Sequence, residues 1–419
     1  MKRFVLYIII LYGGLLLAGC RNETETPAPP PTPTPQPRAE AERTVIVYMA
    51  ADNTLSIAVR EDTTEMAKGK DQIPEGANFI IYLDDRQHKP AIYELTRESG
   101  IKLWKEYDVE MCSTNADVML GVLKEIEQYF PARHYGITLW SHATGWAPER
   151  KPQRRKTFGQ DKDNGATANE MEIPVLRSVL EQLPKFDYLF FDACFMQCIE
   201  VAYELRNVTD FMVGSPAEIP GPGAPYHKIV GALCEGNPQG IIQGYASEYP
   251  LDNTPYTGVL LSCIDCSKLD ALAEATGPFL TQFYMGRNDP VGNKNPCGFG
   301  FQYYCTDLDK YTYQFDMHTI MWRLLSAAEQ PENYTAWMEV FDQAVPVPLR
   351  TLSSTNQWYA NTVSPPYAST AGQVKVQDPE HYGGVSMFVP LNAYNGYGWN
   401  EDFKNTSWYK AAGWEATGW

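Results

Sequence analysis

Two stretches decide the fold of this chain: Tyr135-Gly-Ile-Thr-Leu-Trp-Ser-His142 and Phe186-Asp-Tyr-Leu-Phe-Phe-Asp-Ala-Cys194. Each is a short apolar run, rich in aromatic residues, that ends at a reactive side chain. Runs of this kind are typical of buried strands in a parallel sheet. Because chemistry in open α/β sheets takes place at the carboxyl ends of the strands, we expect His142 and Cys194 to meet at one edge of one sheet.

An imidazole beside a thiol is the arrangement of a general base and its nucleophile. The sequence predicts a helix that opens at Phe195, and a helix N-terminus would lower the pKa of Cys194 from about 8.5. The backbone N–H groups of Cys194 and of Ala143, which lies in the turn after His142, are candidate oxyanion donors. The alternative is that Cys194 is core filler and His142 a structural histidine. Cys198 is expected to lie one helical turn on and to fill the core.

Strands and helices alternate around these stretches, which predicts an α/β fold with a mostly parallel sheet and helices on both faces. Strands are expected at 44–50, 78–83, 91–95, 135–142, 186–194, 211–214, 257–263 and 384–389, and helices at 55–68, 115–130, 170–183, 195–205, 266–285 and 316–345. The C-terminal half is less regular. An aromatic tail over 391–419 is expected to form loops packed on the domain.

The composition limits the partners of this chain. Its 419 residues carry a net charge of −17, which argues against nucleic acid as a partner because phosphate binding needs clustered Lys and Arg. The 10 Trp, 26 Tyr and 17 Phe are enough for a large core and argue against disorder.

The N-terminus has the pattern of an export signal. Two basic residues precede an apolar run over 4–18, and Leu17-Ala-Gly-Cys20 resembles the bacterial lipobox. Residues 1–19 are therefore predicted to be a lipoprotein signal peptide, with lipidation of Cys20 as the membrane anchor. Residues 20–43, with seven prolines between Pro27 and Pro37, are predicted to be an extended stalk. This pattern places the protein in a bacterial cell envelope, on the periplasmic or cell-surface side; the alternative is an ordinary signal peptide with a chance cysteine.

The other eight cysteines do not form a dense disulfide framework. Cys263-x-x-Cys266 with Cys297 and Cys305 could form a metal site, and the alternative is that these cysteines are buried in the core. Burial is the better interpretation, because Cys263 ends an apolar run and no histidine is interleaved. No metal is therefore predicted from this group.

Five motifs resemble one known family. His142 in Leu139-Trp-Ser-His-Ala-Thr-Gly-Trp146 and Cys194 in Phe190-Phe-Asp-Ala-Cys-Phe-Met196 resemble the two signatures of the clostripain-like cysteine peptidases. The stretches Val45-Ile-Val-Tyr-Met-Ala-Ala-Asp-Asn53, Gly214-Ser-Pro-Ala-Glu-Ile-Pro-Gly-Pro-Gly223 and Gly384-Val-Ser-Met-Phe-Val-Pro390 agree with it in the expected order. The resemblance covers 44–390 and implies a caspase-like α/β/α sandwich in that range.

The resemblance also implies roles for single residues. His142 would be the base, Cys194 the nucleophile, and Asp192 the acid that meets a basic P1 side chain; Glu218 is a further acid near the site. Hydrolysis would proceed through an acyl-enzyme on peptide or protein substrates, cleaved after Arg or Lys, by a monomer that needs no cofactor. The chain departs from the family at Ala143, where glycine is usual, and at Tyr226, where some members carry an acid.

A basic loop follows the histidine. Pro148-Glu-Arg-Lys-Pro-Gln-Arg-Arg-Lys-Thr157 holds five cations, which are Arg150, Lys151, Arg154, Arg155 and Lys156. Exposed loops are preferred sites of nicking, and the family is often processed here, so self-cleavage in 149–157 is a hypothesis beside that of a solvated loop. Asp161-Lys-Asp163-Asn-Gly165 resembles part of a calcium loop, and calcium binding is a weaker hypothesis because one residue of the usual spacing is missing.

Two other functions remain open at the level of sequence. One is a non-catalytic surface lipoprotein that keeps the caspase-like fold and binds peptide or glycan. The other is a different thiol hydrolase, such as an amidase of cell-wall peptides. Labelling by a thiol-reactive peptide probe, and a panel of substrates, would separate them.

Overall fold

The computed structural model describes residues 36–147, 158–161, 169–249, 259–281, 315–327, 329–346, 357–358, 374–375, 379–390 and 392–419. The chain divides into two units, Met1–Gln36 and Pro37–Trp419, and all elements below belong to the second unit. The predicted signal peptide, Cys20 and the stalk up to residue 35 lie outside the described residues. Within the described ranges, no helix is both long and apolar enough to span a bilayer.

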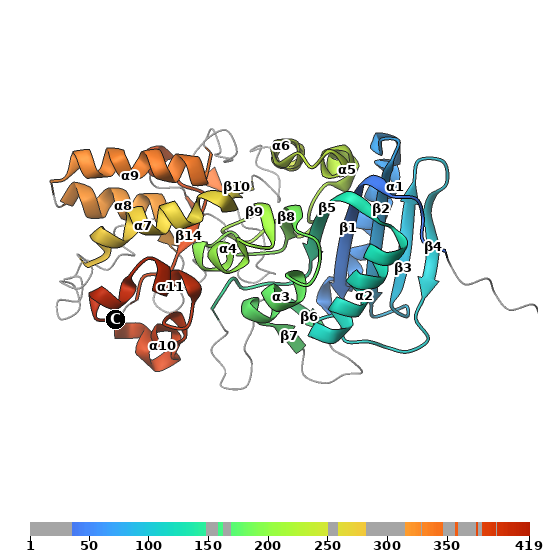
Figure 1. Ribbon diagram of the computed structural model, residues 1–419, viewed down its shortest axis with the longest axis horizontal. Helices are drawn as coiled ribbons and strands as arrows, with labels where there is room; N and C mark the ends of the chain where they lie inside the picture. Colours follow the sequence, from blue (N-terminus) through green and yellow to red (C-terminus); the bar gives the residue numbers. More distant parts are fainter. Residues whose placement is uncertain are drawn as a thin grey trace, which may run out of the picture. The chain divides into compact units, whose positions relative to one another are not determined.

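An eight-stranded sheet forms the centre of the domain, in the order β10-β9-β8-β5-β1-β2-β3-β4 (Figure 1). Its strands are β1 (Ala41–Ala51), β2 (Ala77–Asp85), β3 (Ala91–Thr96), β4 (Gly100–Glu106), β5 (Ala132–Trp140), β8 (Phe186–Asp192), β9 (Thr209–Gly214) and β10 (Ser262–Asp265). The five strands from β9 to β2 are parallel, and β10, β3 and β4 pair antiparallel at the edges. The predicted mostly parallel sheet is confirmed.

Helices cover both faces of this sheet, so the predicted α/β/α sandwich is confirmed (Figure 1). One face packs against α1 (Val59–Lys68), α5 (Tyr226–Glu235) and α6 (Pro238–Glu248), and the other against α2 (Ala116–Tyr129), α3 (Ile173–Leu180) and α4 (Ile199–Leu205). Successive side chains of β8 point to opposite faces of the sheet and so pack in both cores. Tyr188 and Phe190 pack on the α1/α5/α6 side, and Leu189 and Phe191 pack on the α2/α3/α4 side.

The C-terminal half contains α7 (Leu269–Leu280), α8 (Met317–Ala327), α9 (Pro331–Ala344), α10 (Trp399–Phe403), α11 (Ser407–Ala411), β11 (Phe315–Asp316), β12 (Gln357–Trp358), β13 (Val374–Lys375) and β14 (Ser386–Met387). It adds helices and the strands β11 and β14 to the core on the α2/α3/α4 side, and its strands β12 and β13 pair with each other. The expectation that 391–419 forms loops is wrong, because α10 and α11 lie there. Burial of Trp408 and Trp414 at 0% exposure stabilises helices that are too short to persist alone, and the Thr406 hydroxyl caps α11.

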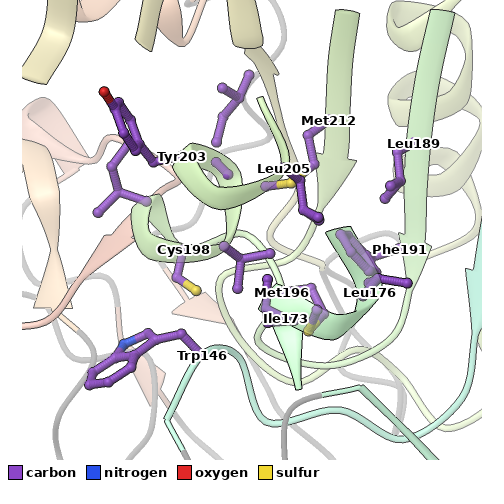
Figure 2. Close-up of a cluster of buried hydrophobic side chains, with 14 of the residues drawn as sticks. Trp146, Ile173, Leu176, Leu189, Phe191, Met196, Cys198, Tyr203, Leu205 and Met212 are labelled. Atoms are coloured by element: carbon purple, nitrogen blue, oxygen red, sulfur yellow. The ribbon is translucent and has the colours of Figure 1, made fainter. Parts of the chain in front are cut away.

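The segment that follows Cys194 is built into the core on the α4 side of the sheet. Figure 2 shows Met196 and Cys198 among Ile173 and Leu176 of α3, Tyr203 and Leu205 of α4, and the strand residues Leu189, Phe191 and Met212. Packing on all sides therefore fixes the position of this segment relative to the sheet.

Candidate functional site

Strand register brings His142 and Cys194 to the same edge of the sheet. Strands β5 and β8 are parallel neighbours, and Trp140 pairs with Asp192. His142 and Cys194 each follow their paired residue by two positions, and adjacent strands lie about 4.8 Å apart. The pairing of β5 with β8 therefore places both residues at the same edge of the sheet, on neighbouring strands.

A threonine at the end of β1 holds the imidazole of His142. The Thr54 hydroxyl lies 2.8 Å from His142 Nε2. Thr54 opens the short 3₁₀ helix η1 (Thr54–Ile57), which is capped by the side chain of Asn53. Buried Asn53 also donates to the carbonyl groups of Ala50 and Gln160, both at 2.8 Å. Sequence analysis missed Thr54, although its place directly after the Asp52-Asn53 turn of a site strand was a usable signal.

The turn after His142 is braced by β6 (Phe158–Asp161), which pairs with β7 (Asn169–Met171). The Gly159 N–H donates to the His142 carbonyl at 2.9 Å, and Ala143 forms a bridge with Phe158. Ala143 does not take the left-handed backbone conformation; Gly145 takes it, with φ 81°. Alanine in place of the family's usual glycine therefore fits this turn without backbone strain.

The segment after Cys194 is not the predicted helix. Helix α4 begins at Ile199, and Phe195 has a left-handed φ of 64°. The backbone N–H groups of Phe195 and Gln197 donate to the carbonyls of Ala217 and Ser215, at 2.9 and 3.0 Å, instead of to a preceding turn. A non-glycine residue at such a φ costs about 1–3 kcal/mol and is tolerated where the surroundings fix it.

The predicted lowering of the Cys194 pKa is also wrong. Burial raises the pKa of this half-buried thiol to about 12, and the charge of Glu218 raises it further than that of Asp192 does. No helix N-terminus offsets these effects, because α4 starts five residues later. Cys194 is therefore a neutral thiol at pH 7 in this structure. Cys198 does not share a helix face with it and is fully buried, in line with a core role.

Asp192 lies on the α1/α5/α6 side of the sheet and is 2% exposed. Its carboxylate accepts the Ala224 N–H at 3.1 Å and the Tyr226 hydroxyl at 3.0 Å. Burial raises the pKa of Asp192 to about 7, although the two hydrogen bonds act in the opposite direction. Tyr226, the departure noted in the sequence, is thus a direct partner of this acid.

A second buried acid lies on the same side and was missed by sequence analysis. Asp62 of α1 is 1% exposed and accepts the Trp140 indole N–H at 2.8 Å. Burial raises the pKa of Asp62 to about 9, and the charge of Asp192 is the next cause. The signal was present in the sequence, because Val59, Asp62 and Met66 occupy one apolar helix face on which an acid is unusual.

Several predicted site residues cannot be placed. Cys20 and the five cations at 150, 151 and 154–156 lie outside the described residues, as do residues 162–165 of the calcium-like loop. Its first acid, Asp161, is fully buried and accepts the Ser113 backbone N–H. Across the ranges that the structure covers, no group of three or more His, Cys, Asp or Glu side chains is arranged to hold a metal ion.

Comparison with known proteins agrees with this architecture. A family model described as the clostripain family (peptidase C11) matches residues 47–419. Clostripain of Hathewaya histolytica is 24% identical over 223 residues, which are 46% of this chain and only 42% of that protein. A secreted C11 cysteine protease of Bacteroides thetaiotaomicron, solved with an irreversible peptide inhibitor, is 30% identical with a TM-score of 0.71. The alignment covers 90% of this chain and 99% of that protease.

A second solved structure is equally similar in fold. It is an inactive zymogen C11 protease from Parabacteroides distasonis, 26% identical, with a TM-score of 0.72 over 90% of this chain and 99% of that one.

Proposed function

The chain belongs to the clostripain family of cysteine peptidases, and we propose that it is an active endopeptidase with Cys194 as nucleophile and His142 as general base. The observation that carries the proposal is the register of β5 and β8, which puts both residues two positions beyond a paired Trp140 and Asp192. The 30% identical Bacteroides protease, which was solved with an irreversible peptide inhibitor, supports it.

The raised pKa of Cys194 determines how the reaction begins. The thiol keeps its proton until substrate binds, so His142 takes that proton as the sulfur attacks the scissile carbonyl carbon. A carbon–sulfur bond forms, and the carbonyl oxygen becomes an oxyanion for which the N–H groups of Ala143 and Cys194 are the proposed donors. His142 then gives the proton to the leaving amine as the C–N bond breaks, and water hydrolyses the thioester.

The proposed P1 preference is for arginine or lysine. Asp192 would be the acid that contacts the cationic side chain. Its carboxyl is buried at the end of β8, two residues before the nucleophile, so the alternation of side chains along a strand allows both to face the same side. Glu218 contributes negative charge near the thiol, since its charge raises the pKa of Cys194. An acid that is nearly neutral when alone becomes a strong partner when a cation enters a low-dielectric pocket.

Self-processing in the 149–157 loop is part of the proposal. The loop carries Arg150, Lys151, Arg154, Arg155 and Lys156, which match the proposed P1 preference. In the sequence it lies between the His142 turn and β6, which braces that turn. The related Parabacteroides protein was solved as an inactive zymogen, which supports a step of activation.

Attachment to the cell envelope through a lipid on Cys20 is likewise proposed from the sequence alone. The Pro-rich stretch to residue 37 would hold the domain away from the membrane. The substrates would then be peptides or proteins outside the cytoplasm.

The test uses the full-length chain in mild detergent beside Cys194→Ala and His142→Ala. Each is assayed on peptides with Arg, Lys, Ala or Asp before a fluorogenic amide, and intact mass is measured to detect a cut in 149–157. We expect the wild type alone to hydrolyse the Arg and Lys peptides, and we expect its loop to be cut while that of Cys194→Ala stays intact. Silence on all four peptides, with a thiol that resists a peptide-based alkylator, would favour the non-catalytic binding lipoprotein instead.

A further inference from the structure

One carboxyl beside the site has no role in the reaction described above. Asp62 is 1% exposed, and its Oδ2 accepts the Trp140 indole N–H at 2.8 Å. Its other oxygen, Oδ1, is buried and has no hydrogen-bond partner among the residues that the structure describes. A buried, half-satisfied acid is costly to keep, so a ligand that completes its contacts is a direct explanation.

Asp62 lies close to Asp192. Trp140, the donor to Asp62, pairs with Asp192 in the sheet. Both carboxyls raise the pKa of Tyr226, whose hydroxyl donates to Asp192, and both raise the pKa of Tyr245. Cys194 acts on Tyr245 as well, so this group of side chains lies close to the thiol. In the described parts of the chain, no lysine or arginine pairs with either carboxyl.

We propose that Asp62 is a second specificity-determining acid of the P1 pocket and that it contacts the cationic end of a P1 lysine or arginine together with Asp192. This inference rests on the proposed function, because it concerns the substrate of the same site. Oδ1 of Asp62 is the acceptor that the cation would use, while Oδ2 stays with Trp140 and holds the carboxyl in place.

Two buried carboxyls would give a stronger preference for a cationic over a neutral P1 side chain than one carboxyl would. Without a cation, burial favours the protonated form of both acids, with pKa values of about 9 for Asp62 and about 7 for Asp192. A cationic side chain restores the ionised form of each and gains two charge-assisted contacts away from water. A neutral side chain of the same shape gains neither, because the acids stay protonated.

The experiment compares cationic and neutral P1 side chains of matched shape in the full-length protein. Peptides with Arg and its neutral isostere citrulline, and with Lys and norleucine, are assayed on the wild type and on Asp62→Asn. The asparagine oxygen still accepts from Trp140, so shape and that hydrogen bond are kept. We expect kcat/KM for Arg and Lys to fall at least about tenfold, and kcat/KM for citrulline and norleucine to change less than about twofold.

The matched control is Glu61→Gln, which removes one negative charge from the neighbouring, exposed position of the same helix. It should leave the Arg-to-citrulline ratio unchanged. An equal loss on cationic and neutral peptides in Asp62→Asn, or a loss in Glu61→Gln as large, would overturn the inference. Arg cleavage by the wild type with an unaltered ratio in Asp62→Asn would overturn the inference alone, whereas no Arg or Lys cleavage by the wild type would overturn the proposed function with it.

A second measurement covers the case in which Asp62→Asn does not fold. The Arg-to-citrulline ratio of the wild type is followed from pH 6 to 9.5, since arginine itself does not titrate there. It should rise through pH 7 as Asp192 ionises and continue to rise towards pH 9 as Asp62 does. A ratio that is flat above pH 8 would contradict the second acid. The other charged or titratable groups near Asp62 are Glu61 and Glu65 on α1, His227 beside Glu65, and the phenols of Tyr226, Tyr245 and Tyr249.

Discussion

The Cys194 side chain combines a reactive atom with surroundings that keep it unreactive. Burial and the charge of Glu218 both favour the protonated thiol, so the resting site holds little thiolate at neutral pH. A nucleophile that forms only when a base accepts its proton is protected from stray alkylation and oxidation.

Removal of the Glu218 charge should make this thiol more reactive. In Glu218→Gln the pKa of Cys194 falls, so its alkylation by iodoacetamide at pH 8 is expected to speed up roughly threefold to tenfold. The rate is followed by fragment-ion mass spectrometry of the peptide that holds Cys194 and Cys198, which assigns the label to one of the two thiols. Glu127→Gln on α2, across the sheet, is the control and should leave the rate unchanged. A slower rate in Glu218→Gln would show that the charge of this glutamate does not act on the thiol.

At the scale of elements, periodicity predicted the strands that matter. The runs ending at His142 and Cys194 became β5 and β8, adjacent and parallel, because continuous apolar runs are required by a sheet that is covered on both faces. The helix predicted from Phe195 failed because its apolar residues pack in the core from a loop whose backbone bonds go to 215 and 217. Helices α5 and α6 were missed, since prolines and glycines there concealed their periodicity.

Strand β6 gives a prediction at this scale, because it holds the His142 carbonyl through Gly159. Gly159 has φ 79°, and a Cβ there would lie 2.5 Å from Thr114 Cγ2. Gly159→Ala is therefore expected to displace β6, to destabilise the domain by more than about 2 kcal/mol and to lower kcat. Gly100 has φ 69° with open space around it, so Gly100→Ala should cost about 1–2 kcal/mol from the backbone alone and leave kcat unchanged.

Denaturant unfolding and initial rates measure both variants. These experiments are done on each variant in parallel, with unfolding followed in the Cys194→Ala background to prevent a cut in the loop. Equal losses of stability and equal kcat values for the two glycine variants would show that β6 does not position the histidine turn.

At the scale of the whole molecule, several acids are buried in forms that favour the proton. Burial raises the pKa of Asp62 and Asp84 to about 9, that of Glu200 to about 8 and that of Asp192 to about 7. The unfolded chain ionises the same groups near pH 4. Unfolding at pH 7 therefore releases protons, so these groups stabilise the fold fully below pH 4 and progressively less as the pH rises towards 9.

The free energy of unfolding of Cys194→Ala should accordingly be higher at pH 5.5 than at pH 8.5, as measured by urea titration at both values. Asp84→Asn should reduce that difference, because its amide does not ionise in either state. A free energy that rises between pH 5.5 and 8.5 would contradict the raised pKa values.

The parts of the candidate site could be predicted from the sequence because each part is a short local motif. The Asn53 turn, the His142 turn and the Cys194 segment could each be read from local sequence. Their mutual hydrogen bonds could not, since these depend on register across the sheet. The two buried carboxyls of the proposed P1 pocket come from α1 and β8, and no local pattern connects them.

The segment that follows Cys194 is held by residues that are synthesised much later in the chain. The Ser386 N–H donates to the Gln197 carbonyl, and the Phe388 N–H donates to Glu200, a contact across 188 positions. A chain grows from its amino end, and contacts of such high sequence separation are the slowest to form. Cys194 is therefore synthesised long before β14, whose neighbourhood contacts the segment that follows the thiol. A nascent or truncated chain that ends before β14 would carry the thiol without these contacts to the segment that follows it, so we expect proteolysis only after β14 has been made.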